Sequence, residues 1–482
     1  MFNNQITTLV LAAVLVFTAI TLLSLLQLGG GDESVHDFVK NNHFKAPEAE
    51  EENSDHHHEL SKSDSSAATL EIPQLHKQPH KDAPVVPKQP VPVVPAVPQQ
   101  PDTSSLEPEK SCPGMQHNPL VSKLFYWKEP TEEDLAYRTP YADAGPAAKY
   151  VSFEPDVGGW NNIRMQMELV LVFAYATGRT LVLPPTQQMY LLSASHKKGE
   201  SWKNIAHSFA DFFPFDRINK RRFPVISMEE YMEKEGITGR FINQETSRVE
   251  YPPKNRTAFK GTDRDDRRLM WRYVRSVSAC PQWHEFKDFV VIPPAPGVNI
   301  SSRPDVAKST AIAASGRTVR YYDEYWVQQP HIHFISNTSV NLRLLEHFYT
   351  FIHFEDEAMD RYYKRFVRDE VHYIDLIFCK AAIILEALLT EEPRGYSAFH
   401  IRRGEFQYKA VKIPADQLIV NVGSLLPAAQ PLVFLASDER NQTWFLPFQQ
   451  RFPGKIRNLD DYMDLAKLRD INPNYLGMIG ES

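Results

Sequence analysis

A chain of 482 residues with a formal net charge of −7 and only three cysteines excludes several classes of protein. The negative charge argues against a general nucleic-acid-binding protein, which needs a basic surface to meet phosphates. No two of Cys112, Cys280 and Cys379 have the spacing of a zinc site, and an odd number of cysteines allows at most one intramolecular disulfide. The length is enough for two or three average domains.

The first 28 residues predict a membrane anchor. Residues 6–28 form a run without a charged side chain, and as a helix this run is roughly 34 Å long, enough to cross the hydrocarbon core of a bilayer. Because residues 1–5 contain no Lys or Arg, the run is typical of an uncleaved signal anchor rather than a cleaved signal peptide. We expect a short cytosolic tail at residues 1–5 and a single-pass type II protein of the Golgi or endoplasmic reticulum membrane, with the rest of the chain in the lumen.

Residues 29–111 are expected to form a disordered stalk. Residues 48–64 are largely charged and include a histidine triplet, and ten prolines fall between Pro73 and Pro108. Such a segment has little to bury and favours extended polyproline II structure. The favoured interpretation is a spacer between the membrane and a folded domain. A docking site for a proline-binding module is the alternative, which a lumenal location disfavours.

From residue 112 onward the sequence predicts an α/β fold. Short apolar runs ended by turn residues predict buried strands, and apolar residues at helical spacing predict helices, the first of them followed by Gly178 as a cap signal. The predicted elements are strands at 181–183, 396–401 and 431–436 and helices at 162–177 and 371–389. Alternating helices and strands indicate mainly parallel sheets with helices on both faces. Ligands of such sheets bind beyond the carboxyl ends of the strands.

The first candidate binding motif is a pair of glycines, Gly158 and Gly159, just before the first predicted helix. Because they lack Cβ atoms, they let a ligand approach the backbone, and the first N–H groups of a helix can hold an anion. Asn161 or Asn162 can cap the helix and also reach a phosphate. Taken alone, the motif is also typical of an ordinary glycine turn with an Asn cap.

The second motif lies where the strand predicted at 396–401 should end, and it contains His400, Arg402 and Arg403. Two neighbouring guanidiniums favour an anion, and the planar fork of Arg suits a diphosphate. A fixed Arg there stabilises the negative charge that develops on a leaving nucleoside diphosphate. The alternative is an ion pair of either arginine with Glu405 or another acid of the core.

The third motif, Asp438 and Glu439, follows the strand predicted at 431–436. A carboxylate at this position can accept hydrogen bonds from a guanine edge or a ribose. Ser437 or Asp438 can instead cap a helix, with acids favoured in its first turn, and both interpretations can hold together.

Taken together, these motifs resemble those of the GDP-fucose protein O-fucosyltransferase family. The resemblance runs from about residue 150 to the end and is carried by Gly158–Met165, Thr177–Pro185, His400–Phe406 and Ala436–Glu439, in the family's order. It implies two Rossmann-like halves of the GT-B type, which we place at residues 112–345 and 346–482. It also implies transfer of fucose from GDP-fucose to a hydroxyl of a protein or glycan, with inversion and without a metal or other cofactor.

The resemblance further implies roles for single residues. Arg402 is expected to be the catalytic residue and to hold the β-phosphate. It suggests His400 on the nucleotide, Asn161 or Asn162 near the phosphates, and Asp438 near the base. The expected donor-binding residues are Gly158, Gly159, Asn161, Asn162, His400, Arg403, Asp438 and Glu439.

Three departures from the family pattern keep a second interpretation open. Glu405 stands where the family usually has Asp, and the glycine turn lacks the carboxylate that some branches place there, so Asp156 is the nearest acid and the general base is unassigned. The chain also ends at Ser482, before a strand and a helix of the family, so its second half is expected to be truncated. The alternative is a catalytically inactive, membrane-tethered binder of a nucleotide sugar or glycan.

Two weaker signals concern metals and glycans. Asp263 and Asp265 match the D-x-D triplet with which GT-A glycosyltransferases hold a metal, but no apolar strand precedes them and residues 266–277 predict a helix, so a helix start is favoured. Four N-glycosylation sequons fit a lumenal domain; they begin at Asn255, Asn299, Asn337 and Asn441.

Overall fold

The structure is a computed structural model. It describes residues 121–143, 148–189, 192, 206–220, 224–254, 264–298, 316–337, 340, 342–403, 412–427, 432–439 and 441–481. The expected anchor at 6–28 and the expected stalk at 29–111 lie outside these residues. Within them, no helix combines the length and the apolar character that crossing a bilayer requires.

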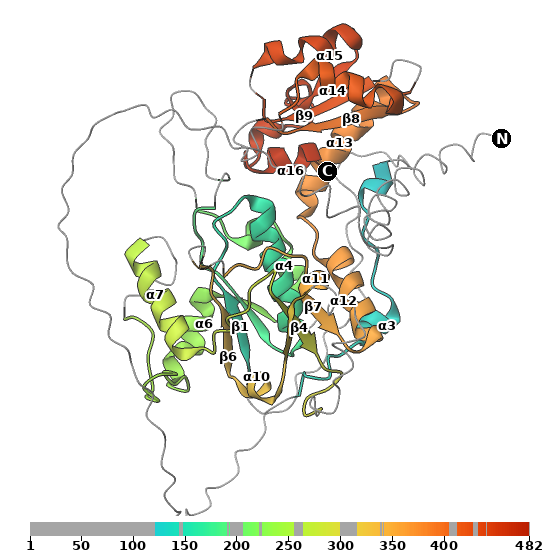
Figure 1. The fold of residues 1–482 in the computed structure, drawn as a ribbon. Helices are drawn as coiled ribbons and strands as arrows, with labels where there is room; N and C mark the ends of the chain where they lie inside the picture. Colours follow the sequence, from blue (N-terminus) through green and yellow to red (C-terminus); the bar gives the residue numbers. More distant parts are fainter. Residues whose placement is uncertain are drawn as a thin grey trace, which may run out of the picture. The chain divides into compact units, whose positions relative to one another are not determined.

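The described strands form three sheets, and every pairing between these strands is parallel, as expected (Figure 1). The first sheet has the order β3-β2-β1-β6, with β3 at Val225–Ser227, β2 at Thr180–Leu183, β1 at Tyr150–Phe153 and β6 at His331–Phe334. The second has the order β5-β4-β7, with β5 at Thr318–Tyr321, β4 at Asp288–Ile292 and β7 at Ile352–Phe354. The third has the order β10-β9-β8, with β10 at Ile456–Asn458, β9 at Leu432–Ser437 and β8 at Tyr396–Ile401.

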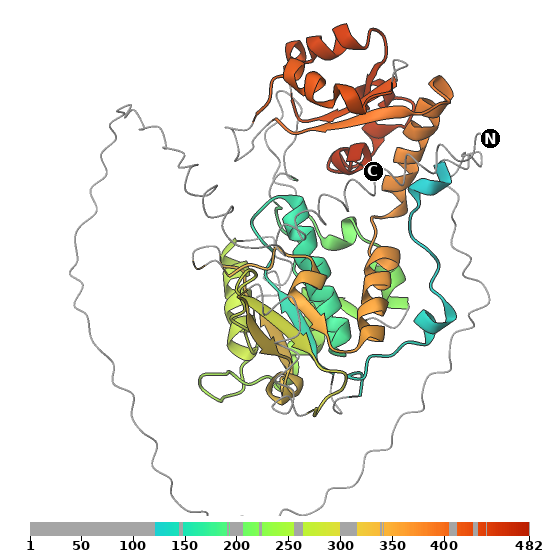
Figure 2. The ribbon, with the colours of Figure 1, turned by 45° about the vertical axis from the view of Figure 1, so that its right-hand side comes forward.

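Helix α4, Trp160–Ala176, is the central helix of the first part (Figure 1, Figure 2). It packs on β1 and β2 and also on α11, Phe348–Phe351, and α12, Glu357–Glu370, so its last two turns are buried all round. The helix ends before Gly178, whose φ is +67° and whose missing Cβ would lie 2.4 Å from the carbonyl oxygen of Tyr141. Both the helix predicted at 162–177 and the strand predicted at 181–183 are confirmed.

Smaller helices complete this part of the chain. The α-helices are α3 Glu132–Ala136, α5 Phe215–Lys220, α6 Met228–Lys234, α7 Arg264–Val277 and α10 Glu324–Gln328. The 3-10 helices are η1 Val121–Leu124, η2 Phe209–Asp211 and η3 Gly236–Thr238.

The second sheet extends past the boundary expected at residue 345. Strand β7 pairs with β4, with Ile352 opposite Val290, and α12 follows directly and packs on β7 and α4. The pairing therefore favours a division of the fold after residue 370. Backbone contacts group residues 101–482 as one compact unit, and the division into two Rossmann-like halves stays a prediction.

The helix predicted at 371–389 is α13, Asp375–Glu391, which begins four residues later than predicted. Val371 instead caps α12, and Ile374 donates its N–H to the carbonyl of Phe212, so residues 371–374 form a connector between two helices. The turn at Gly395, with φ +104°, then leads into β8. The strand predicted at 396–401 is confirmed, and the one predicted at 431–436 is β9, one residue later at each end.

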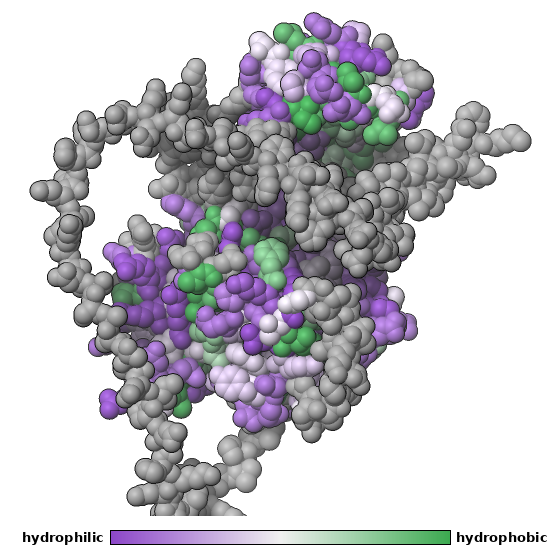
Figure 3. Space-filling model, in the orientation of Figure 1, coloured by the Kyte–Doolittle hydropathy of each residue, from purple (hydrophilic) through white to green (hydrophobic). Residues whose placement is uncertain are grey.

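The remaining helices cover the third sheet. They are α14 Ala415–Val422, η8 Gly423–Leu425, η9 Gln442–Phe445, α15 Leu446–Arg451, η10 Leu459–Tyr462, η11 Leu468–Asp470 and α16 Tyr475–Glu481. On the face drawn in Figure 3 the described surface is mainly hydrophilic, with apolar residues in small groups.

Candidate active site

The second and third sequence motifs meet at one edge of the third sheet. Strands β8 and β9 run parallel with Ile401 opposite Ser437, so the residues that follow each strand emerge side by side. The Ser437 hydroxyl donates to the Ile401 carbonyl oxygen at 2.7 Å and fixes this pairing at its last residue. The expected position of both motifs at carboxyl ends of strands is thereby confirmed.

Arg403 is held at this edge by contacts within the protein. Its backbone N–H donates to Asp438 Oδ1 at 2.5 Å, and its side chain donates from Nε to Glu439 Oε2 at 2.9 Å and from Nη1 to the Ile413 carbonyl at 3.0 Å. The guanidinium also lies 4.6 Å from the ring centroid of Trp444, within the range of a cation–π contact. The ion-pair interpretation therefore applies to Arg403, with Glu439 as its partner, while Glu405 lies outside the described residues.

Three predicted site residues are exposed near the same edge. His400 lies near the end of β8, and Arg402 is the first residue after that strand. Asp438 is also exposed, whereas both carboxylate oxygens of Glu439 accept hydrogen bonds, one from Arg403 and one from the Asn441 N–H. Arg402 and Asp438 are therefore exposed just beyond two neighbouring strand ends, and His400 is exposed within the last two residues of β8.

The glycine turn starts α4, but neither asparagine caps it. Gly159 is the N-cap, and its carbonyl accepts the N–H groups of Asn162 at 2.9 Å and Ile163 at 3.3 Å. Asn161 and Asn162 lie in the first turn, with Asn161 exposed. The Asn cap predicted from the sequence is therefore wrong, because the helix begins at Trp160, two residues earlier than expected.

The two glycines of this turn have different surroundings. A Cβ on Gly158 would lie 2.6 Å from Asn162 Nδ2, 2.7 Å from Asp156 Oδ1 and 3.2 Å from Arg343 Nη2. A Cβ on Gly159 would meet nothing within 4 Å. Gly158 is therefore required by the packing of the protein itself, and Gly159 leaves open space at the helix start.

Asp156, the acid nearest to the glycine turn, is fully committed to structural contacts. Its buried carboxylate accepts the N–H of Gly158 at 2.6 Å and two hydrogen bonds from Arg343, each 2.7 Å long. Such a carboxylate is not available as a general base. Arg343 was not recognised in the sequence, because it belongs to no motif and reaches Asp156 only through the parallel pairing of β1 with β6.

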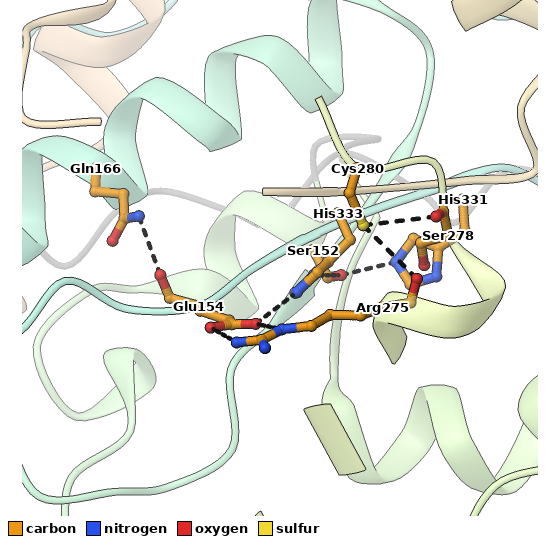
Figure 4. Close-up of polar contacts among 8 residues, drawn as sticks. All are labelled: Ser152, Glu154, Gln166, Arg275, Ser278, Cys280, His331 and His333. Atoms are coloured by element: carbon orange, nitrogen blue, oxygen red, sulfur yellow. Dashed lines mark hydrogen bonds and ion pairs between the residues drawn. The ribbon is translucent and has the colours of Figure 1, made fainter. Parts of the chain in front are cut away.

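A chain of polar side chains, buried except for Arg275, links β1 to β6 and α7 (Figure 4). Ser152 Oγ lies 2.7 Å from His331 Nε2 and 2.8 Å from His333 Nδ1, and the other ring nitrogens contact Tyr231 OH at 2.8 Å and Glu154 Oε1 at 3.1 Å. Arg275 donates to both carboxylate oxygens of Glu154, at 2.5 and 2.6 Å. Sequence reasoning missed this chain, because its members alternate with core residues and match no motif.

The Arg275–Glu154 ion pair sets the direction of the hydrogen bond between His333 and Glu154. Burial raises the pKa of Glu154, but the hydrogen bond from His333 and the guanidinium of Arg275 together lower it below its ordinary value. An ionised Glu154 only accepts, so His333 donates to it from Nε2. Ser152 Oγ joins the rings of His331 and His333, and Tyr231 OH lies at the far end of the chain.

The structure describes some of the residues that the sequence analysis weighed as metal ligands, and two of the three cysteines. In the described part of the chain, no three His, Cys, Asp or Glu side chains gather as a metal site would require. Asp265 lies in the first turn of α7, as expected for a helix start, and Asp263 lies outside the described residues. Cys379 is disulfide-bonded, and Cys280 is a free, partly buried thiol.

Of the sequon asparagines, Asn337 and Asn441 are exposed. Asn255 and Asn299 lie outside the described residues.

We predicted that the glycine turn and Arg402 contact one donor from two sides, and this stays a prediction.

Comparison with known proteins identifies the family. The family model of GDP-fucose protein O-fucosyltransferase matches residues 150–479. Among solved structures, fucosyltransferase NodZ from Bradyrhizobium is 14% identical, with 70% of this chain and 85% of that chain covered and a TM-score of 0.30. POFUT1 in complex with GDP-fucose is also 14% identical, with 70% and 95% covered and a TM-score of 0.30. No curated protein sequence matches the chain significantly. The match to the family model, which spans most of the chain and all three motifs, shows that this protein belongs to the GDP-fucose protein O-fucosyltransferase family and is a fucosyltransferase.

Proposed function

We propose that this fucosyltransferase uses GDP-fucose as its donor and transfers fucose to a hydroxyl of a protein or glycan. The observation that carries the proposal is the family match over residues 150–479. Within that range, Arg402 and Asp438 lie beyond neighbouring strand ends, where ligands of parallel sheets bind.

The proposed reaction is a single displacement with inversion. The acceptor oxygen forms a bond to the anomeric carbon while the bond from that carbon to the β-phosphate oxygen breaks, and GDP leaves with the bonding electron pair. Arg402 binds the β-phosphate and stabilises the charge that develops there, without a metal or other cofactor. The acceptor proton passes to water or to a group of the substrate, because Asp156 is occupied by Arg343.

The other donor contacts are proposed on position and chemistry. The backbone at Gly159 and the side-chain amides of Asn161 and Asn162 lie at the start of α4, where the dipole and the first backbone N–H groups of a helix stabilise an anion. His400 and Asp438 are proposed to contact the nucleotide and its base. Gly158, Arg403 and Glu439 are proposed to support these groups, since their contacts lie within the protein.

The proposed location follows from the uncharged run at residues 6–28. We propose a membrane-anchored protein with its catalytic domain in the lumen of the Golgi or endoplasmic reticulum, and with no nucleic-acid partner. Exposed sequon asparagines such as Asn441 support this location, because N-glycans are added in the lumen.

Donor turnover tests the proposal. The purified protein is incubated with GDP-fucose and a panel of protein and glycan acceptors, and GDP release is followed for the native chain and for Arg402→Ala. Loss of Arg402 should reduce turnover about 10²-fold or more. Arg394→Ala is the matched control. Arg394 is also an exposed arginine, but it lies before the first residue of β8 and pairs with Glu392.

Equal turnover by Arg402→Ala and the native chain would reject the assignment of Arg402. Tight binding of GDP-fucose without GDP release, with every acceptor, would instead favour the inactive binder.

A further inference from the structure

Gln166 is a fully buried amide that joins α4 to the segment leading into the glycine turn. Its Nε2 donates to the Glu154 carbonyl oxygen at 3.0 Å, and its Oε1 accepts the Asp156 N–H at 2.7 Å. Figure 4 shows the side chain pointing from the helix to Glu154. One amide therefore spans Pro155 and bonds the backbone on both of its sides.

The residues on each side of Pro155 are also held from other elements. The Glu154 side chain contacts His333 of β6 and Arg275 of α7, and the Asp156 side chain contacts Arg343 after β6. Asp156 in turn accepts the Gly158 N–H at 2.6 Å. The path from β1 to Gly158 is thus fixed by β6, by α7 and by Arg343 after β6, and Gln166 supplies the contact with the helix that the turn begins.

A buried amide at this position needs both of its hydrogen bonds. The rest of the buried face of α4 is almost entirely apolar, and a buried amide without partners is strongly unfavourable. Both partners of Gln166 are backbone groups of the segment before the turn. Its side chain therefore sets where that segment lies relative to the first turn of α4.

We propose that Gln166 is a positioning residue for donor binding, which holds the glycine turn in the place where the diphosphate is bound. The inference rests on the proposed function, since it assumes that the donor binds at the turn. Gln166 touches no substrate; it acts through the backbone of Glu154 and Asp156. Binding that depends on such geometry is sensitive to shifts of about 1 Å.

The experiment measures KM for GDP-fucose, KM for the acceptor and GDP affinity for the native chain, Gln166→Met and Gln166→Glu. Gln166→Met keeps the volume but loses both hydrogen bonds, and it should raise the donor KM and the Kd of GDP about tenfold or more, with the acceptor KM unchanged.

Gln166→Glu provides a second readout that a purely structural role would not produce. A protonated Glu can donate to the Glu154 carbonyl and accept from the Asp156 N–H, and burial favours the protonated form. The donor KM of this variant, relative to the native chain at each pH, should therefore improve as the pH falls. If Gln166→Met does not fold, this pH series decides the question.

Thr177→Val is the matched control. Thr177 is equally a buried side chain at α4, but its hydroxyl donates to Phe173 at the opposite end of the helix. The control should lower the melting temperature and leave the donor KM unchanged. If the native chain turns over GDP-fucose and both Gln166 variants keep its donor KM, the inference is overturned. If the native chain shows neither turnover nor GDP binding, the proposed function is overturned instead.

Discussion

The guanidinium of Arg403 forms an ion pair with Glu439 at 2.9 Å, with both side chains less than one fifth exposed. The pair joins the residues after β8 to those after β9. Arg403 supports the end of the sheet, and Arg402, the residue before it, is exposed.

We expect Arg403→Met and Glu439→Gln each to destabilise the protein, and their effects to be non-additive. A coupling of about 0.5–3 kcal/mol is typical of residues in one ion-pair network. Urea unfolding of the two single variants and the double variant measures it. Strictly additive effects would show that the pair contributes nothing beyond its separate contacts.

The two glycines of the turn should respond differently to substitution. Gly158→Ala places a methyl group within 2.7 Å of Asp156 and Asn162, and overpacking of this kind costs about 1–3 kcal/mol. Gly159→Ser has open space and provides a better N-cap for α4, so stability should be kept. If the donor approaches the backbone at Gly159, that variant should nevertheless bind GDP more weakly.

Melting temperature and GDP titration of the two variants together check this expectation. Unchanged GDP affinity in Gly159→Ser would place the donor away from the turn. An unchanged melting temperature in Gly158→Ala would contradict the packing described for Asp156.

Stability should fall as the pH is lowered from about 7 to 5. Burial, with His333 and nearby arginines, lowers the pKa of His331 well below its ordinary value of 6.5, and burial also lowers the pKa values of His353 and His372. The unfolded chain therefore binds more protons than the folded protein below about pH 6.5, so stability rises with pH in this window. Each such histidine contributes a slope of up to about 1.4 kcal/mol per pH unit.

Urea unfolding at several pH values between 5 and 7 checks the slope. His353→Gln, at a less buried site, should reduce it without removing it. A flat profile in the native chain would mean that the buried histidines are protonated in the folded state.

Cys280 should react slowly with alkylating reagents at neutral pH. Burial, together with the carboxylate of Glu154, raises its thiol pKa to about 12. Only about one thiol in 10⁴ is then ionised at pH 8, and the thiolate is the reactive form. Mass spectrometry of the non-reduced protein after iodoacetamide treatment checks this, and modification at the rate of free cysteine would contradict the described surroundings of the thiol.

The sequence by itself determined the features that depend on neighbouring residues. Apolar spacing and Gly178 located α4 to within two residues, and the runs at 396–401 and 431–436 located β8 and β9. The motifs after those strands then indicated the edge of the sheet at which Arg403 and Asp438 meet, because parallel strands end on the same side.

Only the tertiary structure decided which polar groups form hydrogen bonds or ion pairs within the protein. Asp156 and Arg343 are 187 residues apart and pair because β6 lies next to β1. In the sequence Gln166 is one residue of a predicted helix, and only the structure shows its hydrogen bonds to the backbone of Glu154 and Asp156. Propensity and spacing act over a few residues, whereas ion pairs and buried hydrogen bonds depend on strand order, which a single sequence does not contain.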